Sequence, residues 1–438
     1  MVKLRKFFSF SLIISFFFAL PSFCEIPPAA REKEKLNLAE LVRLAQERNP
    51  GLFAIREQIR AEQSRIWPQT TLPDPVLSLN LKNVSLNQFT IGKEMMSGIG
   101  FSFSQMIPFP GKLRLQREIA KTKTKRTEVW LEAYSLSLSR QIKELYSQLF
   151  YYQRALEVLN KKRSLLEKAL ELATIRYSVG GGVQNDVFKA QLELNEIETM
   201  IKPMEQMEQA LEGQINALLA FPLDKPLGWA EEIHFYELSP SFEDLIKAAE
   251  EKSPQLEEVR LMIEASSKEV DLSRRDFWPN FMIQGGKEFK GAFKDMYEIM
   301  IGIEIPLYFK RKQAKNLEAA VAELNQARYS FQAKQNELNS MINENYLMAK
   351  NAEKLIRITR DKLLLQASLS LESSLANYKV GKVDFLALLA DIDSLYSYEM
   401  EYYRQLSELW QAVSRLEELC GLDLLLMEGE GNAKKDKE

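Results

Sequence analysis

Two stretches of the chain, residues 112–176 and 311–377, each run for more than sixty residues without a glycine or a proline. Continuous helices of this length would extend about 100 Å, since an α-helix rises about 1.5 Å per residue. They would be far longer than the roughly 11-residue helix typical of a globular domain, so they could not wrap one compact core. The sequence therefore predicts a rod or a wall of helices.

The chain is also a tandem repeat. Four landmarks recur in order at spacings of 198 to 204 residues: Pro50 and Pro254, Pro108 and Pro306, Tyr177 and Tyr378, Asp186 and Asp384. Small loop insertions between two copies of one unit explain such drift. We predict a first repeat over 25–222, with strands at about 75–83 and 97–107 and a helix at 112–176. A linker follows over 223–240. We predict a second repeat over 241–424, with strands at about 280–289 and 297–305 and a helix at 311–377.

The N-terminal residues have the pattern of a signal peptide, and the C-terminal residues have the composition of a disordered tail. Residues 1–24 carry Lys3, Arg5 and Lys6 before an apolar run of about fourteen residues, which predicts a secretory signal peptide. Acylation at Cys24 is an alternative, but Pro21 and Phe23 fit a lipoprotein signal badly. The lysine-rich residues 425–438 predict a disordered tail.

Composition excludes several classes of function. The chain has one histidine, His234, and Cys420 is the one cysteine left after cleavage, which argues against a metal site or a catalytic triad. Its 58 basic residues against 61 acidic ones give no basic stripe for nucleic acid. We therefore expect that the chain is not an enzyme, holds no cofactor and has no nucleic-acid partner.

Strict alternation of apolar and polar residues marks the strands. The apolar positions, which we predict to face lipid, are Leu77, Leu79, Leu81, Ile99, Phe101, Phe103, Ile299, Ile301 and Ile303. Such strands fit an ordinary sheet packed on a core, or a transmembrane barrel with a polar lumen. Export and the great length of the neighbouring helices favour the barrel.

Strands in lipid require a closed sheet, because every backbone polar group must be paired there. The four strands of one chain cannot enclose a lumen, and eight give a barrel filled by side chains. Three chains would supply twelve strands. We therefore predict a homotrimer that closes a transmembrane β-barrel, and the apolar heptads of the long helices indicate coiled-coil packing. A periplasmic coiled-coil scaffold is the alternative, but it would not account for the alternating strands.

Several motifs carry a family resemblance when taken together and in order. They are Leu72-Pro73-Asp74-Pro75, Trp278-Pro279-Asn280, residues 105–112 (QMIPFPGK), and the twice-occurring Tyr-x-Val-Gly followed by Asp. On these motifs the chain resembles the TolC-type outer-membrane efflux channels over nearly all of its mature length. The Pro-Phe-Pro-Gly-Lys junction is most similar to the branch that serves metal-cation pumps.

The resemblance implies a trimeric duct for efflux or type I secretion, with an α+β fold in which a twelve-stranded barrel continues into a twelve-helix periplasmic tube. It also implies that the helix tips dock a periplasmic adaptor protein linked to an inner-membrane pump. The tip residues are Tyr177, Val179, Gly180, Asp186, Tyr378, Val380, Gly381 and Asp384. Helix capping by the glycines and aspartates explains these residues equally well.

The family also narrows its pore at the tip with acidic rings. Asp384 matches one ring position, but the second acidic position is Ala387 here, so a double ring is in doubt. Asp391 and Asp393 are candidates to compensate. A plain N-cap remains the alternative role for Asp384.

Overall fold

The computed structural model describes residues 35–84 and 91–424. These residues belong to one compact unit that begins at Lys35. The predicted signal peptide, Cys24 and the predicted tail lie outside the described residues.

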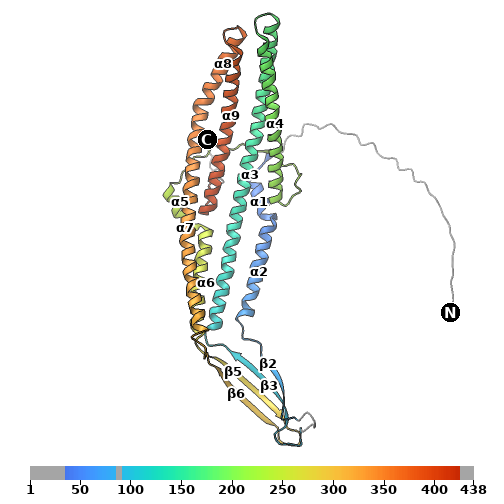
Figure 1. Ribbon diagram of the computed structural model, residues 1–438, viewed down its shortest axis with the longest axis vertical. Coiled ribbons are helices and arrows are strands. Elements are labelled where there is room, and N and C mark those ends of the chain that lie inside the picture. The colour runs from blue at the N-terminus through green and yellow to red at the C-terminus, as the bar shows by residue number, and fades with distance from the viewer. Residues whose placement is uncertain (1–34, 85–90, 425–438) are drawn as a thin grey trace, which may run out of the picture. The chain divides into compact units, whose positions relative to one another are not determined.

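The two repeats contain the same order of elements. The first comprises α1 (Leu38–Arg48), α2 (Pro50–Thr70), β2 (Val76–Lys82), β3 (Gly98–Ile107), α3 (Lys112–Ser178) and α4 (Gln184–Leu218). The second comprises α5 (Phe242–Lys252), α6 (Pro254–Arg275), β5 (Asn280–Phe289), β6 (Met296–Glu304), α7 (Gln313–Ile358), a π-helical turn (Thr359–Leu363), α8 (Leu364–Lys379) and α9 (Phe385–Cys420). Within this unit the strands lie at one end of the helices, and the α3–α4 and α8–α9 turns lie at the other (Figure 1).

A proline ends the first helix of each repeat and begins the second. Asn49 and Ser253 precede Pro50 and Pro254, and both adopt extended backbone angles, with ψ of 121° and 117°. A proline disfavours the helical conformation of the residue before it, while its own fixed φ suits a first helical position. The same physical break therefore occurs twice.

The long helices of the two repeats differ. α3 runs unbroken for 67 residues, as the sequence predicts. The expected continuous helix over 311–377 instead begins at Gln313 and is interrupted by the π-helical turn, where Thr359 is buried. Arg357 precedes this turn and Arg360 lies within it, and the guanidinium groups of both lie within 6 Å of the ring of Phe235. The second helix is thus interrupted where residues of the linker between the repeats pack against it.

One antiparallel sheet joins the two repeats. Its strand order is β2-β3-β5-β6, so the hairpin of each repeat pairs with the other through β3 and β5. Within the described part of the chain, β2 and β6 each pair with a single neighbour. The sheet therefore has two open edges.

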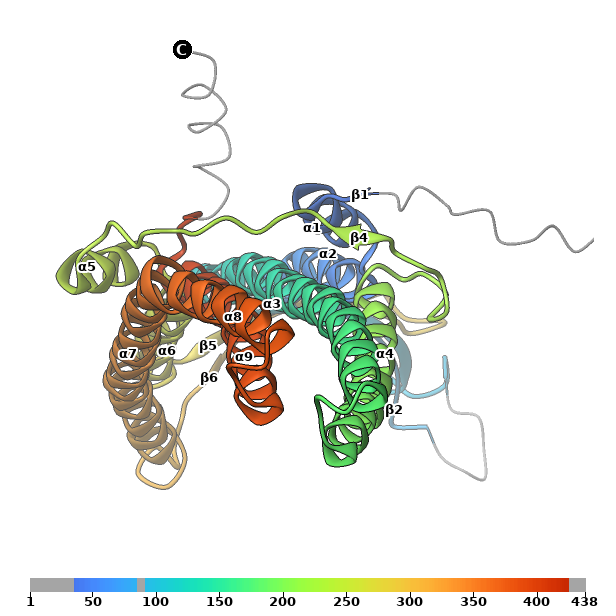
Figure 2. The same cartoon turned by 90° about the horizontal axis from the view of Figure 1, so that it is seen from above.

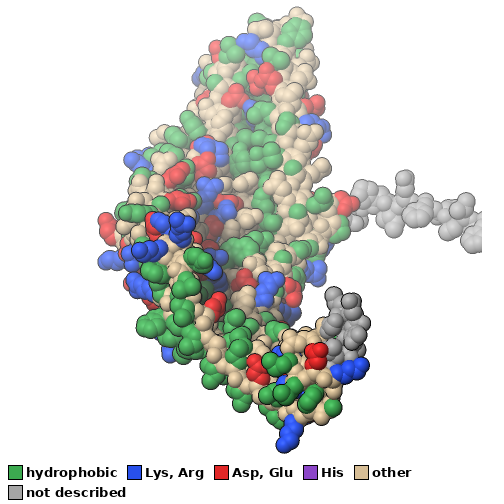
Figure 3. Space-filling view, turned by 60° about the horizontal axis from the view of Figure 1, so that its bottom comes forward, with side chains coloured by type: hydrophobic (Ala, Val, Ile, Leu, Met, Phe, Trp, Pro, Cys, Tyr) green, Lys and Arg blue, Asp and Glu red, His purple; other side chains and the backbone are tan. Residues whose placement is uncertain are grey.

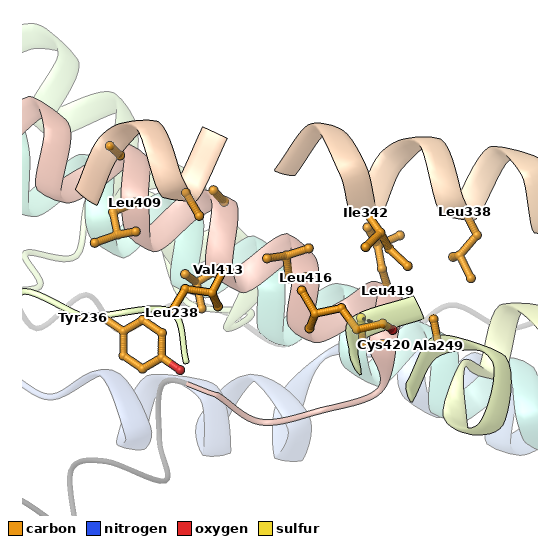
Figure 4. Packing of buried hydrophobic residues seen from close by; sticks show 14 of the residues in the cluster. Tyr236, Leu238, Ala249, Leu338, Ile342, Leu409, Val413, Leu416, Leu419 and Cys420 are labelled. Carbon is orange, nitrogen blue, oxygen red and sulfur yellow. Dashed lines mark hydrogen bonds between the residues drawn. The ribbon is translucent and has the colours of Figure 1, made fainter. Parts of the chain in front are cut away.

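Among the described residues, three clusters of buried apolar side chains hold the helices together. One lies in the first repeat around Leu138 and Phe150. Another lies in the second repeat around Ile342 and Leu416 (Figure 4). The third packs α3 and α4 against α8 and α9 near the tips. The core is thus spread along the helices and is shared by both repeats at the tips.

The predicted linker is packed against the helices. Its residues form β4 (Trp229–Ala230), which pairs in parallel with β1 (Lys35–Leu36). The Gln153 amide donates to the Gly228 carbonyl at 3.0 Å and accepts from the Ala230 N–H at 2.9 Å. Trp410 donates to the His234 carbonyl at 3.0 Å. Seen from above, the linker crosses the outer side of a curved layer of long helices (Figure 2).

Candidate functional site: the sheet and the helix tips

The sheet presents one face on which apolar side chains from every strand lie in register. The paired positions are Leu77 with Phe103, Leu79 with Phe101, Leu81 with Ile99, Phe281 with Ile303, and Ile283 with Ile301. Ile299 and Ile301 on β6 are 84% and 72% exposed. In the space-filling view, hydrophobic side chains are spread over this end of the molecule (Figure 3). An exposed apolar surface shared by four strands is unusual for a soluble monomer and is typical of an interaction site.

The opposite face of the sheet carries most of the polar side chains in the same register, together with methionines such as Met282 and Met300. Ser78 pairs with Ser102, which pairs with Gly286, and Gly286 pairs with Glu298. The Asn80 amide donates to the Ser102 hydroxyl at 3.4 Å. The alternation read from the sequence thus becomes two distinct faces once the strands pair.

A lysine crosses this polar face. Lys82 on β2 reaches over β3 to the carboxylates of Glu288 at 3.1 Å and Glu298 at 3.6 Å. Gly98 on β3 makes room for this contact, because a Cβ there would lie 2.8 Å from a carboxylate oxygen of Glu288. The two acids outnumber the lysine, so this cluster carries a net negative charge at neutral pH.

The junction between β3 and α3 is built around a buried cation. Lys112 is 7% exposed, and its Nζ lies 3.2 Å from the Asp276 carboxylate and 3.1 Å from Oδ1 of Asn280. Phe109 stacks on Trp278 with their ring centroids 5.2 Å apart. The Pro-Phe-Pro-Gly-Lys motif therefore has a structural role, since it links the first repeat to the second where the sheet meets the helices.

The helix tips contain the predicted docking residues. Tyr177, Val179 and Val380 are 47%, 75% and 67% exposed. Gly180 and Gly381 have φ of 74° and 75°, the left-handed conformation that glycine favours after a helix. Each tip therefore combines a tight turn with an exposed valine.

Tyr378 differs from its counterpart Tyr177. It is 1% exposed and packs on Phe385, and the guanidinium of Arg176 lies 4.6 Å from its ring centroid. Burial raises the pKa of its hydroxyl, with a smaller contribution from the carboxylate of Asp186. The expectation that Tyr378 contacts a docked protein is therefore corrected: in this conformation its ring belongs to the core between the tips.

The predicted gate acids have partners within the chain. Asp384 is exposed and caps α9 by accepting from the Ala387 N–H at 2.8 Å. Asp391 accepts hydrogen bonds from the hydroxyls of Ser370 and Ser374 on α8. Asp393 pairs with Lys162 on α3 at 2.6 Å, so its carboxylate is held between helices. Asp186 lies in the first turn of α4, and Val183 occupies the N-cap position.

Arg176 is a residue that sequence reasoning missed. It donates to the Tyr378 carbonyl at 2.9 Å and to the Gly181 carbonyl at 2.8 Å, so one side chain joins the tips of both repeats. The only hint of this role in the sequence is that Arg176 directly precedes Tyr177, the tyrosine of the repeated motif. Its partner lies 202 residues away, and periodicity cannot predict such a pair.

None of the helices in residues 35–84 and 91–424 is long and apolar enough to cross a membrane. The same ranges contain no group of three or more histidine, cysteine or carboxylate side chains arranged to hold a metal ion.

Comparison with known proteins identifies relatives by family and by fold. The model of the outer membrane efflux protein family matches residues 41–211 and 245–422, one match in each repeat. No curated protein sequence matches the chain. Among solved structures, the outer membrane protein VceC of Vibrio cholerae is 17% identical with a TM-score of 0.74, covering 88% of this chain and 96% of that one. The CmeC outer membrane channel of Campylobacter jejuni is 14% identical with a TM-score of 0.70, covering 92% and 89%. The MtrE outer membrane channel of Neisseria gonorrhoeae, solved in its open state, is 17% identical with a TM-score of 0.70, covering 88% and 89%.

Proposed function

This chain belongs to the outer membrane efflux protein family, and on that basis we propose that it is a passive duct of the outer membrane. The duct exports small molecules or metal ions as the last component of a tripartite efflux system or a type I secretion system. It has no chemistry of its own. Its sheet spans the outer membrane and its helices extend into the periplasm.

The open sheet with its exposed apolar face is the observation that carries this proposal. Strand edges in lipid must be paired, so the edges at β2 and β6 require further copies of the chain. Two copies would give an eight-stranded barrel filled by side chains, whereas three give twelve strands and room for a pore. We therefore favour a homotrimer. A periplasmic scaffold would leave the same apolar face without a partner.

The tips are proposed to dock a periplasmic adaptor that connects the duct to an inner-membrane pump. Tyr177, Val179 and Val380 supply exposed apolar and aromatic surface for this contact. Gly180 and Gly381 shape the two turns, and Asp186 and Asp384 begin the helices that follow them. Tyr378 is excluded because it is buried.

Asp384 is the proposed gate residue, since its exposed carboxylate would occur three times around a trimer axis. Asp391 and Asp393 are weaker gate candidates, because hydroxyls of α8 and the Lys162 ammonium already engage them. A carboxylate ring would favour the passage of cations.

Planar-bilayer recordings of the purified protein test the function and the gate together. In these recordings we expect stable conductance steps and a preference for cations. Chemical cross-linking of the same protein should give three joined subunits on denaturing gels. Asp384→Asn retains an oxygen that can cap α9 but removes the charge, so we expect it to conduct with a reduced cation preference. A wild-type protein that is a water-soluble monomer without conductance would refute the duct. A conducting variant with unchanged selectivity would instead remove Asp384 from the gate.

A further inference from the structure

The turn between β6 and α7 exposes three large apolar side chains followed by three cations. Its sequence from Leu307 to Lys312 is Leu-Tyr-Phe-Lys-Arg-Lys. Leu307, Tyr308 and Phe309 are 77%, 79% and 45% exposed, and the three cations are also exposed. Backbone bonds from the Arg311 and Lys312 N–H groups to the Tyr308 carbonyl, both at 3.0 Å, give the segment a defined conformation. We call this segment the basic turn.

The first repeat uses the corresponding residues differently. Pro108 and Pro306 align the two junctions, so Lys112 corresponds to Lys310. Lys112 is buried and engaged by Asp276 and Asn280, whereas the cations of the basic turn form no ion pair with any residue of 35–84 or 91–424. One copy of the junction is therefore turned inward, and the other presents its cations to the surroundings.

Nearby carboxylates do not neutralise the basic turn. Asp276 and Glu304 line a cavity of about 370 Å³ together with Lys312, but neither lies within ion-pair distance of it. Asp276 is paired with Lys112 at 3.2 Å, and Glu304 accepts from the Asn280 amide at 3.0 Å. The three cations thus constitute an unneutralised positive patch at the surface.

The patch continues the apolar face of the sheet. Ile301 and Ile303 on β6, and Ile305 directly after it, precede the patch and are 72%, 56% and 65% exposed. If the sheet spans the bilayer, the basic turn lies where the strands meet the helices, at the periplasmic boundary of the membrane (Figure 1). Aromatic side chains are favoured at such boundaries, and adjacent lysine and arginine side chains attract anionic headgroups.

We propose that the basic turn, Leu307–Lys312, binds anionic phospholipid headgroups of the periplasmic leaflet of the outer membrane. The leucine and the two aromatic side chains contact the acyl boundary, and the three cations contact headgroup phosphates. A trimer would carry three such sites around the base of the barrel. The site therefore rests on the proposed function, because it requires the sheet to lie in a membrane.

Thermal unfolding of the detergent-solubilised full-length protein tests the site. The probes are dioctanoyl phosphatidylglycerol, dioctanoyl phosphatidylcholine and inorganic phosphate. A ligand that binds only the native state raises the melting temperature, so we expect phosphatidylglycerol to raise it by a few degrees and the other two to leave it unchanged. This shift should disappear in 1 M salt, where the Debye length falls to about 3 Å.

Variants assign the effect to the basic turn. The combination Lys310→Gln, Arg311→Gln and Lys312→Gln should abolish the shift. The matched combination Lys121→Gln, Lys168→Gln and Lys247→Gln removes the same charge from exposed helical positions and should retain it. If the first combination fails to fold, the charge-conserving combination Lys310→Arg, Arg311→Lys and Lys312→Arg should fold and retain the shift.

Each outcome decides for or against the site. An equal shift from phosphatidylcholine would show non-specific lipid stabilisation, and an equal shift from inorganic phosphate would show a simple anion site; either result overturns the proposal. A full shift in the glutamine variant also overturns it. Conductance in planar bilayers is a separate readout, so failure of the wild type to conduct would refute the duct without affecting the binding result.

Discussion

An arginine placed on one face or the other of β6 tests the orientation of the sheet. Ile301 lies on the apolar face and Met300, its neighbour in sequence, lies on the polar face. The nine residues of β6 extend about 31 Å at 3.4 Å per residue. A tilt of about 40° reduces this to roughly 23 Å, which matches the ~25 Å apolar band of an outer-membrane barrel. Ile301 is one residue from the centre of the strand, so the proposed spanning arrangement places it near the middle of the membrane.

The expected cost follows from this depth. An arginine on the lipid face at mid-membrane destabilises a barrel by about 2–4 kcal/mol per chain. A value of about 3 kcal/mol corresponds to a roughly 150-fold change in the folding equilibrium. A trimer multiplies the penalty by the number of chains, so Ile301→Arg should nearly abolish assembly. Met300→Arg places the same charge on the face that the proposal assigns to the lumen, so this variant should assemble with little loss.

Refolding from urea into phosphatidylcholine vesicles measures both variants. The fraction folded is read from heat-modifiable migration on gels and from protease resistance. Ile301→Leu is the matched control for side-chain size and should refold like the wild type. Equal losses in the two arginine variants, or no loss in Ile301→Arg, would refute the assigned faces.

Two further predictions concern the tip and the core. Arg176→Ala removes the donors that join the two tips, so we expect faster hydrogen exchange over residues 374–386 and a local loss of about 1–3 kcal/mol, with exchange in the sheet unchanged. Unchanged exchange at the tip would contradict this role of Arg176. The Cys420 thiol is fully buried and burial raises its pKa to about 12, so maleimide at neutral pH should modify the Cys420 peptide only after unfolding in urea. Rapid modification of the folded protein, measured by mass spectrometry, would show that this core opens.

The periodicity of apolar residues and the positions of glycine and proline were sufficient to predict the main elements of the fold. The absence of glycine and proline over 112–176 predicts α3, and strict alternation predicts the apolar face that includes Leu79 and Ile301. The left-handed turns at Gly180 and Gly381 follow from a repeated glycine after a long helix. Each of these features depends on local chemistry, which a sequence displays directly.

Features that depend on distant partners could not be predicted in this way. Lys82 and Glu288 meet only because Gly98 on an intervening strand leaves room. The π-helical turn at Thr359 has no glycine or proline to mark it. Arg357 before the turn and Arg360 within it contact the ring of Phe235, which lies more than a hundred residues earlier. Tyr378 has the same local motif as Tyr177 and is nevertheless buried, because Arg176 of the other repeat covers its ring.

The two repeats have diverged at corresponding positions, and the differences complement one another. Arg176 in the first tip clamps Tyr378 in the second, while Asn377 occupies the position of the arginine in the second repeat. The first junction buries its lysine against the second repeat, whereas the second junction exposes its cations. Because the first repeat supplies Arg176 and Lys112 and the second supplies their partners, the repeats are not interchangeable. Moving the tips apart within one chain must therefore break the contacts between Arg176 and Tyr378, while the buried Lys112 junction at the other end can hold the repeats together.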